Sequence, residues 1–333
     1  MTKIVSLFPK YLLALALLFT LGCERDPEEL QIAPFPNTAV VFDDGFTAGL
    51  NYAAFGGSKV DAFEVVTDES FAGQASMRIA VPDMGDPSGA YAGGVYFVDG
   101  GRNLTGYTTL SFWARASKAA NLDLVGFGND LGANRYQVAA TNVAMTTNWQ
   151  KYYIPIPDAS VLTQERGMFF YSEGPEDGRG YTFWIDEVRF ENNNEIAYTG
   201  PRIFSGLDSV ATVETGATFA AAGDISFNLP SGINQIYQAA SAYFTYTSSN
   251  PTVASVSPTG MVTVMDEGEA VITAKVGDLD AVGTLTITST GDPVLPDVAA
   301  PAPTVGQDSV ISLYSNAYED EPVDFYNGFW EFS

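Results

Sequence analysis

Between Ala39 and Phe190 the chain is a series of short apolar or alternating runs, each broken within a few residues by Gly, Asp or Asn. The runs include AVVF (39–42), SMRIAV (76–81), LSFWARA (110–116), LDLVGFG (122–128), YYIPIP (152–157) and MFFYS (168–172). No stretch in this region keeps a helical period for three turns. About ten strands over roughly 150 residues are typical of a two-sheet sandwich, and in particular of a jelly roll.

The composition excludes several classes of function. The 333 residues contain no histidine, so Ser-His-Asp and Cys-His nucleophiles and the usual histidine-ligated zinc sites are absent. The net charge of -25, from 40 acidic and 15 basic residues, would repel a phosphate backbone, so nucleic acid is not an expected partner. The length leaves room for two domains or more.

The first 22 residues have the pattern of an export signal. Lysines flank an apolar run that is too short to span a bilayer comfortably and that ends in Leu21-Gly22-Cys23. This ending resembles the lipobox of bacterial lipoproteins, although Thr20 stands where that motif prefers Leu. The resemblance implies a lipid anchor on Cys23, the only cysteine, followed by an acidic tether over residues 23–37. The alternative is an ordinary signal peptide with an incidental thiol.

The run YTFWIDEVRF (181–190) predicts a strand with one irregularity. Phe183 and Ile185 share one face, and the apolar register then slips by one residue across Asp186-Glu187. Such a slip indicates a β-bulge, which re-aims a side chain. We expect Asp186 to point toward the edge of the sheet, where it could hold a cation.

Residues 38–195 resemble the galactose-binding-like jelly roll of carbohydrate-binding modules. The resemblance rests on FDDGF (42–46), ESFAGQASMRI (69–79), LSFWARA, NWQKYYIPIP (148–157) and YTFWIDEVRF. In that family an acidic residue of the first strand and the aspartate of the last strand commonly hold a structural Ca²⁺. The resemblance therefore implies Asp43 or Asp44 with Asp186 as ligands, together with backbone carbonyls near Ser70. The alternative is a group of solvated acids at strand ends.

Sugar binding requires flat apolar faces for pyranose rings and planar polar groups for hydroxyls. Strand alternation turns Trp113, Arg115, Trp184 and Tyr153 away from the core, and Tyr91 lies at a strand end nearby. We expect these five residues to bind carbohydrate, because large apolar side chains left on a sheet face usually mark a binding surface. The alternative is that each is half-buried packing.

A second domain is predicted over residues 200–290. The run from Thr245 to Val276 is identified as a member of the group 2 bacterial Ig-like domains. The matching residues are Asn250-Pro251, Val253-Ala254, Val256, Gly260, Val262, Gly268, Ala270 and Ile272, while Tyr246 stands where many members carry Trp. Such domains are usually spacers or adhesive modules, so no site is assigned to this one. Residues 291–306 are a proline-rich linker, and residues 307–333, with a strand expected at 310–314, resemble the truncated start of a further jelly roll.

Catalysis within these residues is not predicted. A paired-carboxylate glycosidase is the natural candidate in a chain without histidine, but Glu173, Glu176 and Asp177 lie in a glycine-rich stretch where we expect no desolvation. The fold class is therefore all-β: a jelly roll, an Ig-like sandwich and the start of a further β domain.

The function expected from the sequence is the capture of polysaccharide or oligosaccharide at the cell surface. The chain would be held on the outer membrane by its lipid anchor alone, near glycan-uptake or glycoside hydrolase proteins. The negative charge favours a neutral glucan. Two alternatives remain open: the chain is the non-catalytic front of a secreted glycoside hydrolase, or it is an adhesin.

Overall fold

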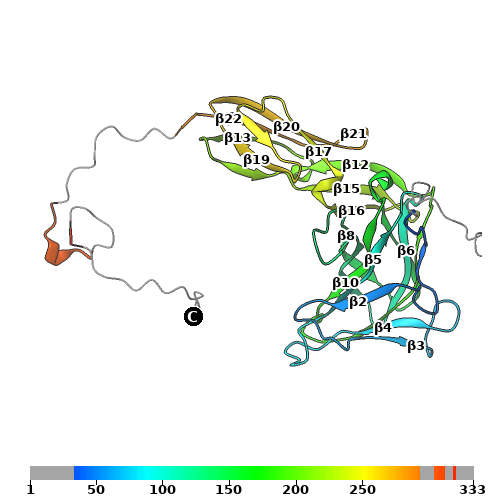
Figure 1. Ribbon diagram of the computed structural model, residues 1–333. Coiled ribbons are helices and arrows are strands. Elements are labelled where there is room, and N and C mark those ends of the chain that lie inside the picture. Colours follow the sequence, from blue (N-terminus) through cyan, green and yellow to red (C-terminus); the bar gives the residue numbers. More distant parts are fainter. Residues whose placement is uncertain (1–33, 293–303, 312–317, 320–333) are drawn as a thin grey trace, which may run out of the picture.

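A computed structural model describes residues 34–292, 304–311 and 318–319, and it is built almost entirely of β-strands (Figure 1). In this part of the chain no helix is long and apolar enough to cross a membrane. The predicted signal peptide and Cys23 lie outside the described residues, as does most of the predicted C-terminal module. Of the strand expected at 310–314, Val310 and Ile311 are described and are not in a strand.

Sheet A has six strands: β1 (Val40–Phe42), β3 (Phe63–Val66), β4 (Ser76–Ala80), β6 (Thr109–Ala116), β9 (Gln150–Pro155) and β11 (Thr182–Glu191). Sheet B has eight: β2 (Leu50–Ala54), β5 (Ala92–Arg102), β7 (Ala120–Phe127), β8 (Val138–Met145), β10 (Glu165–Glu173), β12 (Ala197–Ile203), β15 (Gly223–Asn228) and β16 (Asn234–Ala239). The strand order is β3-β4-β11-β6-β9 in sheet A, with β1 also paired to β11, and β12-β15-β16-β8-β7-β10-β5-β2 in sheet B. The predicted two-sheet jelly roll is confirmed.

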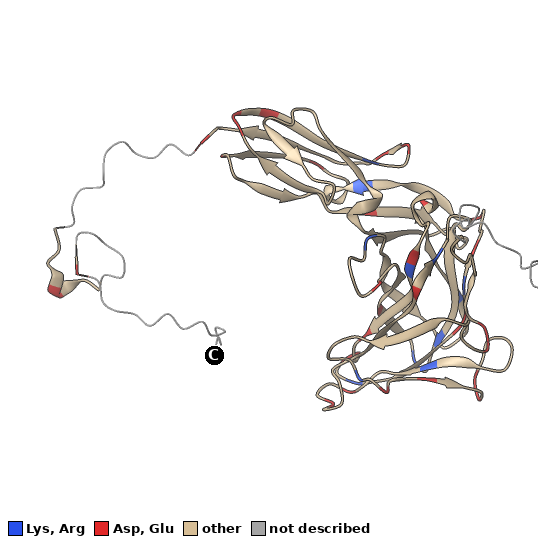
Figure 2. Cartoon of the chain, in the orientation of Figure 1, with Lys and Arg blue, Asp and Glu red and all other residues tan. Residues whose placement is uncertain are grey.

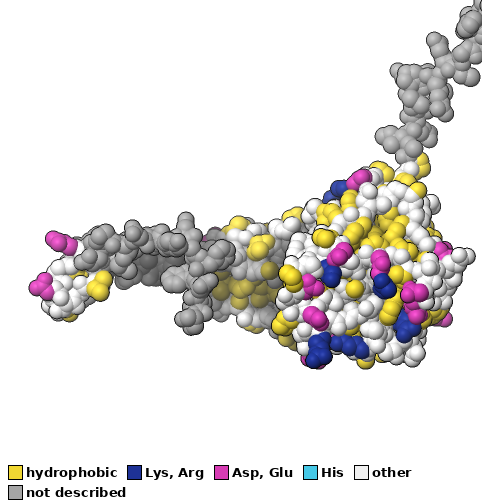
Figure 3. All heavy atoms as spheres, turned by 90° about the horizontal axis from the view of Figure 1, so that it is seen from below, with side chains coloured by type: hydrophobic (Ala, Val, Ile, Leu, Met, Phe, Trp, Pro, Cys, Tyr) yellow, Lys and Arg dark blue, Asp and Glu magenta, His cyan; other side chains and the backbone are white. Residues whose placement is uncertain are grey.

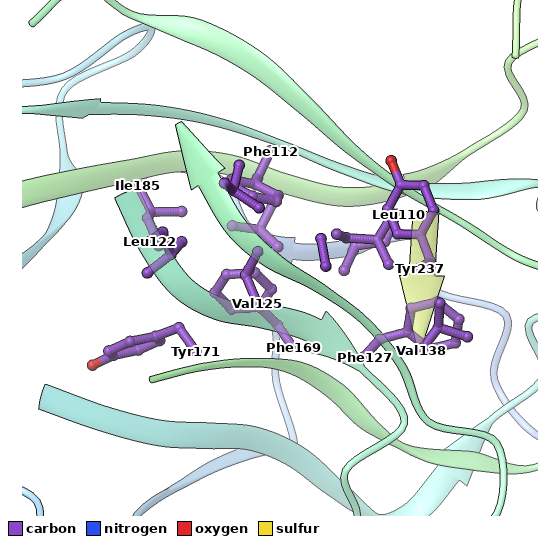
Figure 4. Close-up of a cluster of buried hydrophobic side chains, with 14 of the residues drawn as sticks. Leu110, Phe112, Leu122, Val125, Phe127, Val138, Phe169, Tyr171, Ile185 and Tyr237 are labelled. Carbon is purple, nitrogen blue, oxygen red and sulfur yellow. The ribbon is translucent and has the colours of Figure 1, made fainter. Parts of the chain in front are cut away.

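The core of the jelly roll lies between the two sheets. Alternating residues of β6 and β11, such as Phe112 and Ile185, meet alternating residues of β7 and β10, such as Val125 and Phe169 (Figure 4). All four side chains are at most 1% exposed. The residues that point inward alternate along each strand with a period of two, as predicted. All six of the sequence runs cited above overlap strands.

Strand β11 contains the predicted bulge. Its pairing with β6 shifts register between Asp186 and Arg189, and Glu187 has a positive φ of 51°. The expected position at a sheet edge is wrong, because β11 lies between β4 and β6. However, β4 pairs only with the first half of β11 and β1 pairs with Val188 and Arg189, so the bulge faces the gap between these two partners. Asp186 is 0% exposed there.

The Ig-like part has a sandwich of its own. One sheet contains β13 (Asp208–Val213), β22 (Thr284–Ser289), β20 (Gly268–Val276), β17 (Thr245–Ser248) and β21 (Leu279–Asp280), and the other contains β14 (Thr218–Ala220), β19 (Met261–Val264) and β18 (Ala254–Val256). The motif residues Ala254, Val262 and Ile272 are buried in its core. Gly260 has a φ of +77°, and a Cβ there would lie 2.9 Å from the ring of Tyr246, so glycine is required.

The two parts share a sheet and a core. Strand β16 pairs with β8, where Gln238 stands opposite Ala139, so β12, β15 and β16 extend the jelly-roll sheet. The Tyr237 hydroxyl donates to the carbonyl of Tyr153 over 2.9 Å. Figure 4 shows Tyr237 at the end of the jelly-roll cluster, beside Leu110. The predicted limits of the two domains remain a prediction, but the chain between them is not a free linker.

Candidate functional site

Four of the five sequence-predicted sugar-binding residues lie on the outer side of sheet A. Their neighbours along the strands, Phe112, Ala114, Phe183 and Ile185, are buried in the core, whereas Trp113, Arg115, Trp184 and Tyr153 are half-buried. The predicted outward orientation is therefore confirmed. Neither tryptophan is sealed between the two sheets.

The segment of residues 67–75 folds over this outer side. The Phe71 ring stacks on Trp113 with 3.6 Å between ring centroids and an interplanar angle of 11°. Glu69 accepts hydrogen bonds from Arg115 at 3.0 Å and from Trp149 at 3.1 Å through the same Oε1 atom. The described contacts of Trp113 and Arg115 thus hold this segment in place, and their role as sugar ligands remains a prediction.

The remaining charges on the outer side of sheet A are also paired. The Arg115 guanidinium lies 5.4 Å from the ring centre of Trp184, and Lys151 lies 5.5 Å from that of Tyr153 while it is ion-paired with Glu191 at 2.8 Å. Arg78 pairs with Glu64, and Arg189 pairs with Glu187 and Asp43. Charged residues are scattered along the fold (Figure 2). On the face in Figure 3, basic and acidic side chains lie next to one another.

The predicted metal ligands meet near the bulge. Asp186 accepts hydrogen bonds from the backbone N–H groups of Phe71 at 2.8 Å, Ala72 at 3.2 Å and Glu187 at 2.7 Å. Burial raises the pKa of Asp186, and the negative charges of Asp44 and Asp43 raise it further. Within the described residues, however, no three acidic side chains gather closely enough to hold a metal by themselves.

Asp44 contributes to the same region through a distinct backbone conformation. It has a φ of +53°, and its Oδ1 accepts the N–H of Gln74 and the N–H of Ala75 at 2.8 Å. A Cβ on Gly73 would lie 2.2 Å from this carboxylate, so glycine is needed at that position. Asp43 is exposed and lies 3.7 Å from Arg189. The structure thus brings Asp44 and Asp186 to one segment, with Asp43 at its border.

A second apolar surface lies on the outer side of sheet B, and we call it the outer-face cluster. It consists of the buried Val95, Ala139 and Phe170 and the half-buried Ala53, Phe55, Phe97 and Leu124, and it is separate from the main core. Cross-strand partners form a continuous row from Ala53 through Val95, Phe170 and Gly126 to Ala139. A Cβ on Gly126 would lie 3.0 Å from the Phe170 ring, so glycine lets this ring lie against the sheet.

Polar side chains border the outer-face cluster. Asn51 stands opposite Phe97 and donates to Asp99 over 3.2 Å, and Asp99 lies 3.8 Å from Arg166. Ser172 and Thr141 flank Leu124 in the neighbouring row. Aromatic surface with hydroxyl and amide groups at its border has the composition of a sugar-binding surface.

Tyr91 belongs to this side of the molecule. A Cβ on Gly93 would lie 2.7 Å from the Tyr91 ring and 3.2 Å from Phe55, so Tyr91 lies near Phe55. The Tyr91 hydroxyl donates to the carbonyl of Gly56 over 2.9 Å. The five sequence-predicted sugar-binding residues are therefore not one site. Four lie on sheet A, and Tyr91 lies beside the outer-face cluster of sheet B.

The sequence analysis missed Phe97, Phe170 and Leu124. A usable signal was present in MFFYS, because four consecutive apolar residues on a strand must place apolar side chains on both faces. Phe169 and Tyr171 enter the core, so Phe170 must lie on the opposite face. The same holds for Val95 beside Tyr96 in β5.

Two glutamates of β10 correct the expectation about desolvation. Burial, together with the negative charges of Asp123 and Glu176, raises the pKa of Glu173 to about 7. Burial also raises the pKa of Glu165 to about 7. Glu173 is 1% exposed and accepts the N–H of Asp123 at 2.6 Å, so a substrate cannot reach it.

The raised pKa values of Glu165 and Glu173 predict that the folded state is more stable at acidic pH than at neutral pH. Folding raises the pKa of both carboxyls from 4.5 to about 7, so the folded state favours their protonated form. The folded state is therefore most stable relative to the unfolded state below pH 4.5, and this stability is lost as the pH rises through about 7. A pKa raised from 4.5 to about 7 costs about 3 kcal/mol for each group above pH 7, so we expect a melting temperature about 10 °C lower at pH 8 than at pH 5. Differential scanning calorimetry of Glu165→Gln and Glu173→Gln checks this. Each substitution should flatten the profile, and unchanged profiles would contradict the assignment.

The jelly roll carries aromatic side chains bordered by amides and hydroxyls on its outer face, a composition that is typical of carbohydrate-binding β-sandwiches. Family models agree with this class. Residues 38–192 match carbohydrate binding domain 30, and residues 233–288 match the bacterial Ig-like domain of group 2. The chain therefore contains a carbohydrate-binding module followed by a group 2 Ig-like domain, and both sequence resemblances are confirmed.

Solved structures with similar chain traces include two modules from Clostridium thermocellum. The family 30 module of the cellulase Cel9D-Cel44B is 16% identical, and the match covers 48% of this chain and 96% of that one with a TM-score of 0.31. The family 11 module in complex with a β-1,3-1,4-mixed-linked tetrasaccharide is 13% identical and covers 47% and 96%, with a TM-score of 0.33. A β-1,2-glucanase from Parabacteroides distasonis is 14% identical and covers 78% and 40%, with a TM-score of 0.30. The curated proteins contain no match to the chain.

Proposed function

We propose that the chain captures a neutral glucan through the outer-face cluster of sheet B. The observation that carries this proposal is the half-buried apolar group of Phe55, Phe97 and Leu124, which packs on the buried Phe170 in a region that matches a carbohydrate-binding family. A net charge of -25 disfavours sulfated or uronic polymers, and Arg115 and Arg166 are each within ion-pair distance of an acid. The Ig-like domain then acts as a spacer.

The placement of the protein is part of the same proposal. The Leu21-Gly22-Cys23 sequence supports a lipid anchor in the outer membrane, with the sandwiches exposed at the cell surface. Its partners there would be polysaccharide and neighbouring glycan-uptake or glycoside hydrolase proteins. The alternative role as the front of a glycoside hydrolase is supported by the resemblance of residues 307–333 to the start of a further module.

Structural calcium between β1 and the bulge is also proposed. The residues present fit a hard cation, because Asp44 and Asp186 are carboxylates; burial raises the pKa of Asp186, and the charges of Asp44 and Asp43 raise it further. Asp43 and backbone carbonyls near Ser70 would complete an oxygen shell. When bound, the ion would neutralise these charges and fasten the segment of residues 67–75 to β11. This segment carries Phe71, which covers Trp113.

Affinity electrophoresis of the full-length chain against β-glucans, xylan, alginate and agar tests the binding function. We expect retardation by a neutral β-glucan, and Phe97→Ala should weaken it about tenfold, because a lost aromatic contact costs roughly 1–2 kcal/mol. Trp113→Ala tests the sequence-predicted sugar ligand on sheet A: if the outer-face cluster is the site, this variant should bind like the wild type. A loss of binding in Trp113→Ala alone would move the site to sheet A. Retardation by no glycan would favour the adhesin, and sugar release would favour the hydrolase.

A further inference from the structure

A pocket of about 860 Å³ opens where the jelly roll meets the β15–β16 hairpin, and we call it the junction pocket. Its walls come from β8, from β9, from the loop between β15 and β16 and from the start of β16. The jelly roll alone supplies only one side, so the pocket exists because the two parts share sheet B. Its volume falls within the range of about 300–1,000 Å³ that is typical of small-ligand sites.

The floor and the facing walls of the junction pocket are apolar. Phe112 and Ile154 of the core form part of its floor. The Tyr152 ring stacks on Phe112 with centroids 5.5 Å apart, and its hydroxyl donates to the carbonyl of Ala144 over 3.0 Å, which fixes the ring at the wall. From the hairpin, Ile233 and Ile236 line the pocket although they are 64% and 48% exposed.

The polar groups at the junction pocket are amides rather than charges. Asn142, Gln150, Asn234 and Gln235 line it. Of the described residues in the lining, Lys151 alone is charged, and it is paired with Glu191. In a chain with 40 acidic residues, a pocket without a carboxylate in its described lining is unfavourable for cations.

Two of these amides have no partner within the described chain. The side chains of Asn142 and Gln235 make no hydrogen bond to described residues, and Asn142 has a positive φ of 53° in the middle of β8. Asparagine tolerates this conformation better than most residues. Planar amides that are available beside tyrosine and isoleucine surfaces match the hydroxyls and the C–H faces of a sugar ring.

We infer that the junction pocket is a second saccharide site, which binds an uncharged oligosaccharide. The inference rests on the proposed function only in that the ligand is a glycan. Thr141 lines the pocket and stands opposite Leu124 of the outer-face cluster, so the two surfaces adjoin at β8. A single polymer chain could therefore contact both.

Isothermal titration of the full-length chain with cellotetraose and a mixed-linkage β-glucan tetrasaccharide tests the inference. The wild type should bind two ligands per chain. A variant with Ile233→Asn and Gln235→Ala should lose one of them, with its Kd weakened at least about tenfold, while Phe97→Ala should lose the other. Both positions of the first variant are outside the core, so its melting temperature should remain unchanged. Val210→Asn, at a residue that is 76% exposed on β13, is the matched control and should keep both sites.

The possible results separate the two proposals. One ligand in the wild type, lost in Phe97→Ala and unaffected by the pocket variant, would overturn the second site and leave the proposed function intact. One ligand lost only in the pocket variant would support the junction pocket and overturn the outer-face site. Binding of neither tetrasaccharide by the wild type would contradict both.

Discussion

A chain that ends at Asn194 is expected to aggregate, or to melt at least about 15 °C below a chain that contains residues 34–292. The truncation removes Ile203, Ile225, Phe227 and Tyr237, which are all at most 5% exposed and belong to the jelly-roll core. Loss of a buried large apolar side chain costs about 2–5 kcal/mol, so the sum is comparable to the total stability of a domain, about 5–15 kcal/mol. Thermal unfolding followed by circular dichroism measures the difference.

Because truncation removes many residues at once, point variants at Tyr237 test the junction with the chain length unchanged. Tyr237→Ala removes a fully buried ring and should cost about 3–5 kcal/mol, whereas Tyr237→Phe removes only the hydrogen bond to Tyr153 and should cost about 1 kcal/mol. Equal and cooperative melting of the truncated and the longer chain would show that the junction contributes little. The domains would then be independent folding units.

The jelly roll could be predicted because its strands follow the period of two, but the shared sheet could not. The pattern of NQIYQA (234–239) is compatible with a strand, yet nothing local specifies β8 as its partner. The pairing depends on contacts between residues about 100 positions apart, such as Gln238 with Ala139. The sequence therefore indicated two sandwiches in series, and the structure adds the continuous sheet between them.

The same distinction explains the result at the candidate site. The alternation of apolar residues correctly predicted that Trp113 and Trp184 point outward, because the direction of a side chain depends only on its own strand. Whether such a residue meets solvent depends on other segments, and Phe71, 42 residues earlier, covers Trp113. The bulge at Asp186 was predictable from its apolar register, whereas the gap between β4 and β1 that it faces was not.

Replacement of Asp186 by alanine is expected to lower the free energy of unfolding by about 4 kcal/mol. The carboxylate is fully buried and accepts three backbone N–H groups, and each donor left unpaired in the interior costs about 1–3 kcal/mol. For a sandwich of this size, that corresponds to a fall of about 10 °C in the melting temperature. In EDTA, where no cation is bound, Asp43→Ala, at an exposed residue, should change it by less than about 2 °C.

Chelation separates the hydrogen-bonding role of Asp186 from the proposed calcium site. A cation that binds only the folded chain at about 100 times its Kd adds about 2.7 kcal/mol, so EDTA should lower the melting temperature of the wild type by several degrees. Asp186→Asn keeps one oxygen for the N–H groups of Phe71 and Ala72 but loses the charge, so its melt should no longer respond to EDTA. If the wild type melts at the same temperature with and without EDTA, the carboxylate acts through its hydrogen bonds alone, because these do not depend on a metal.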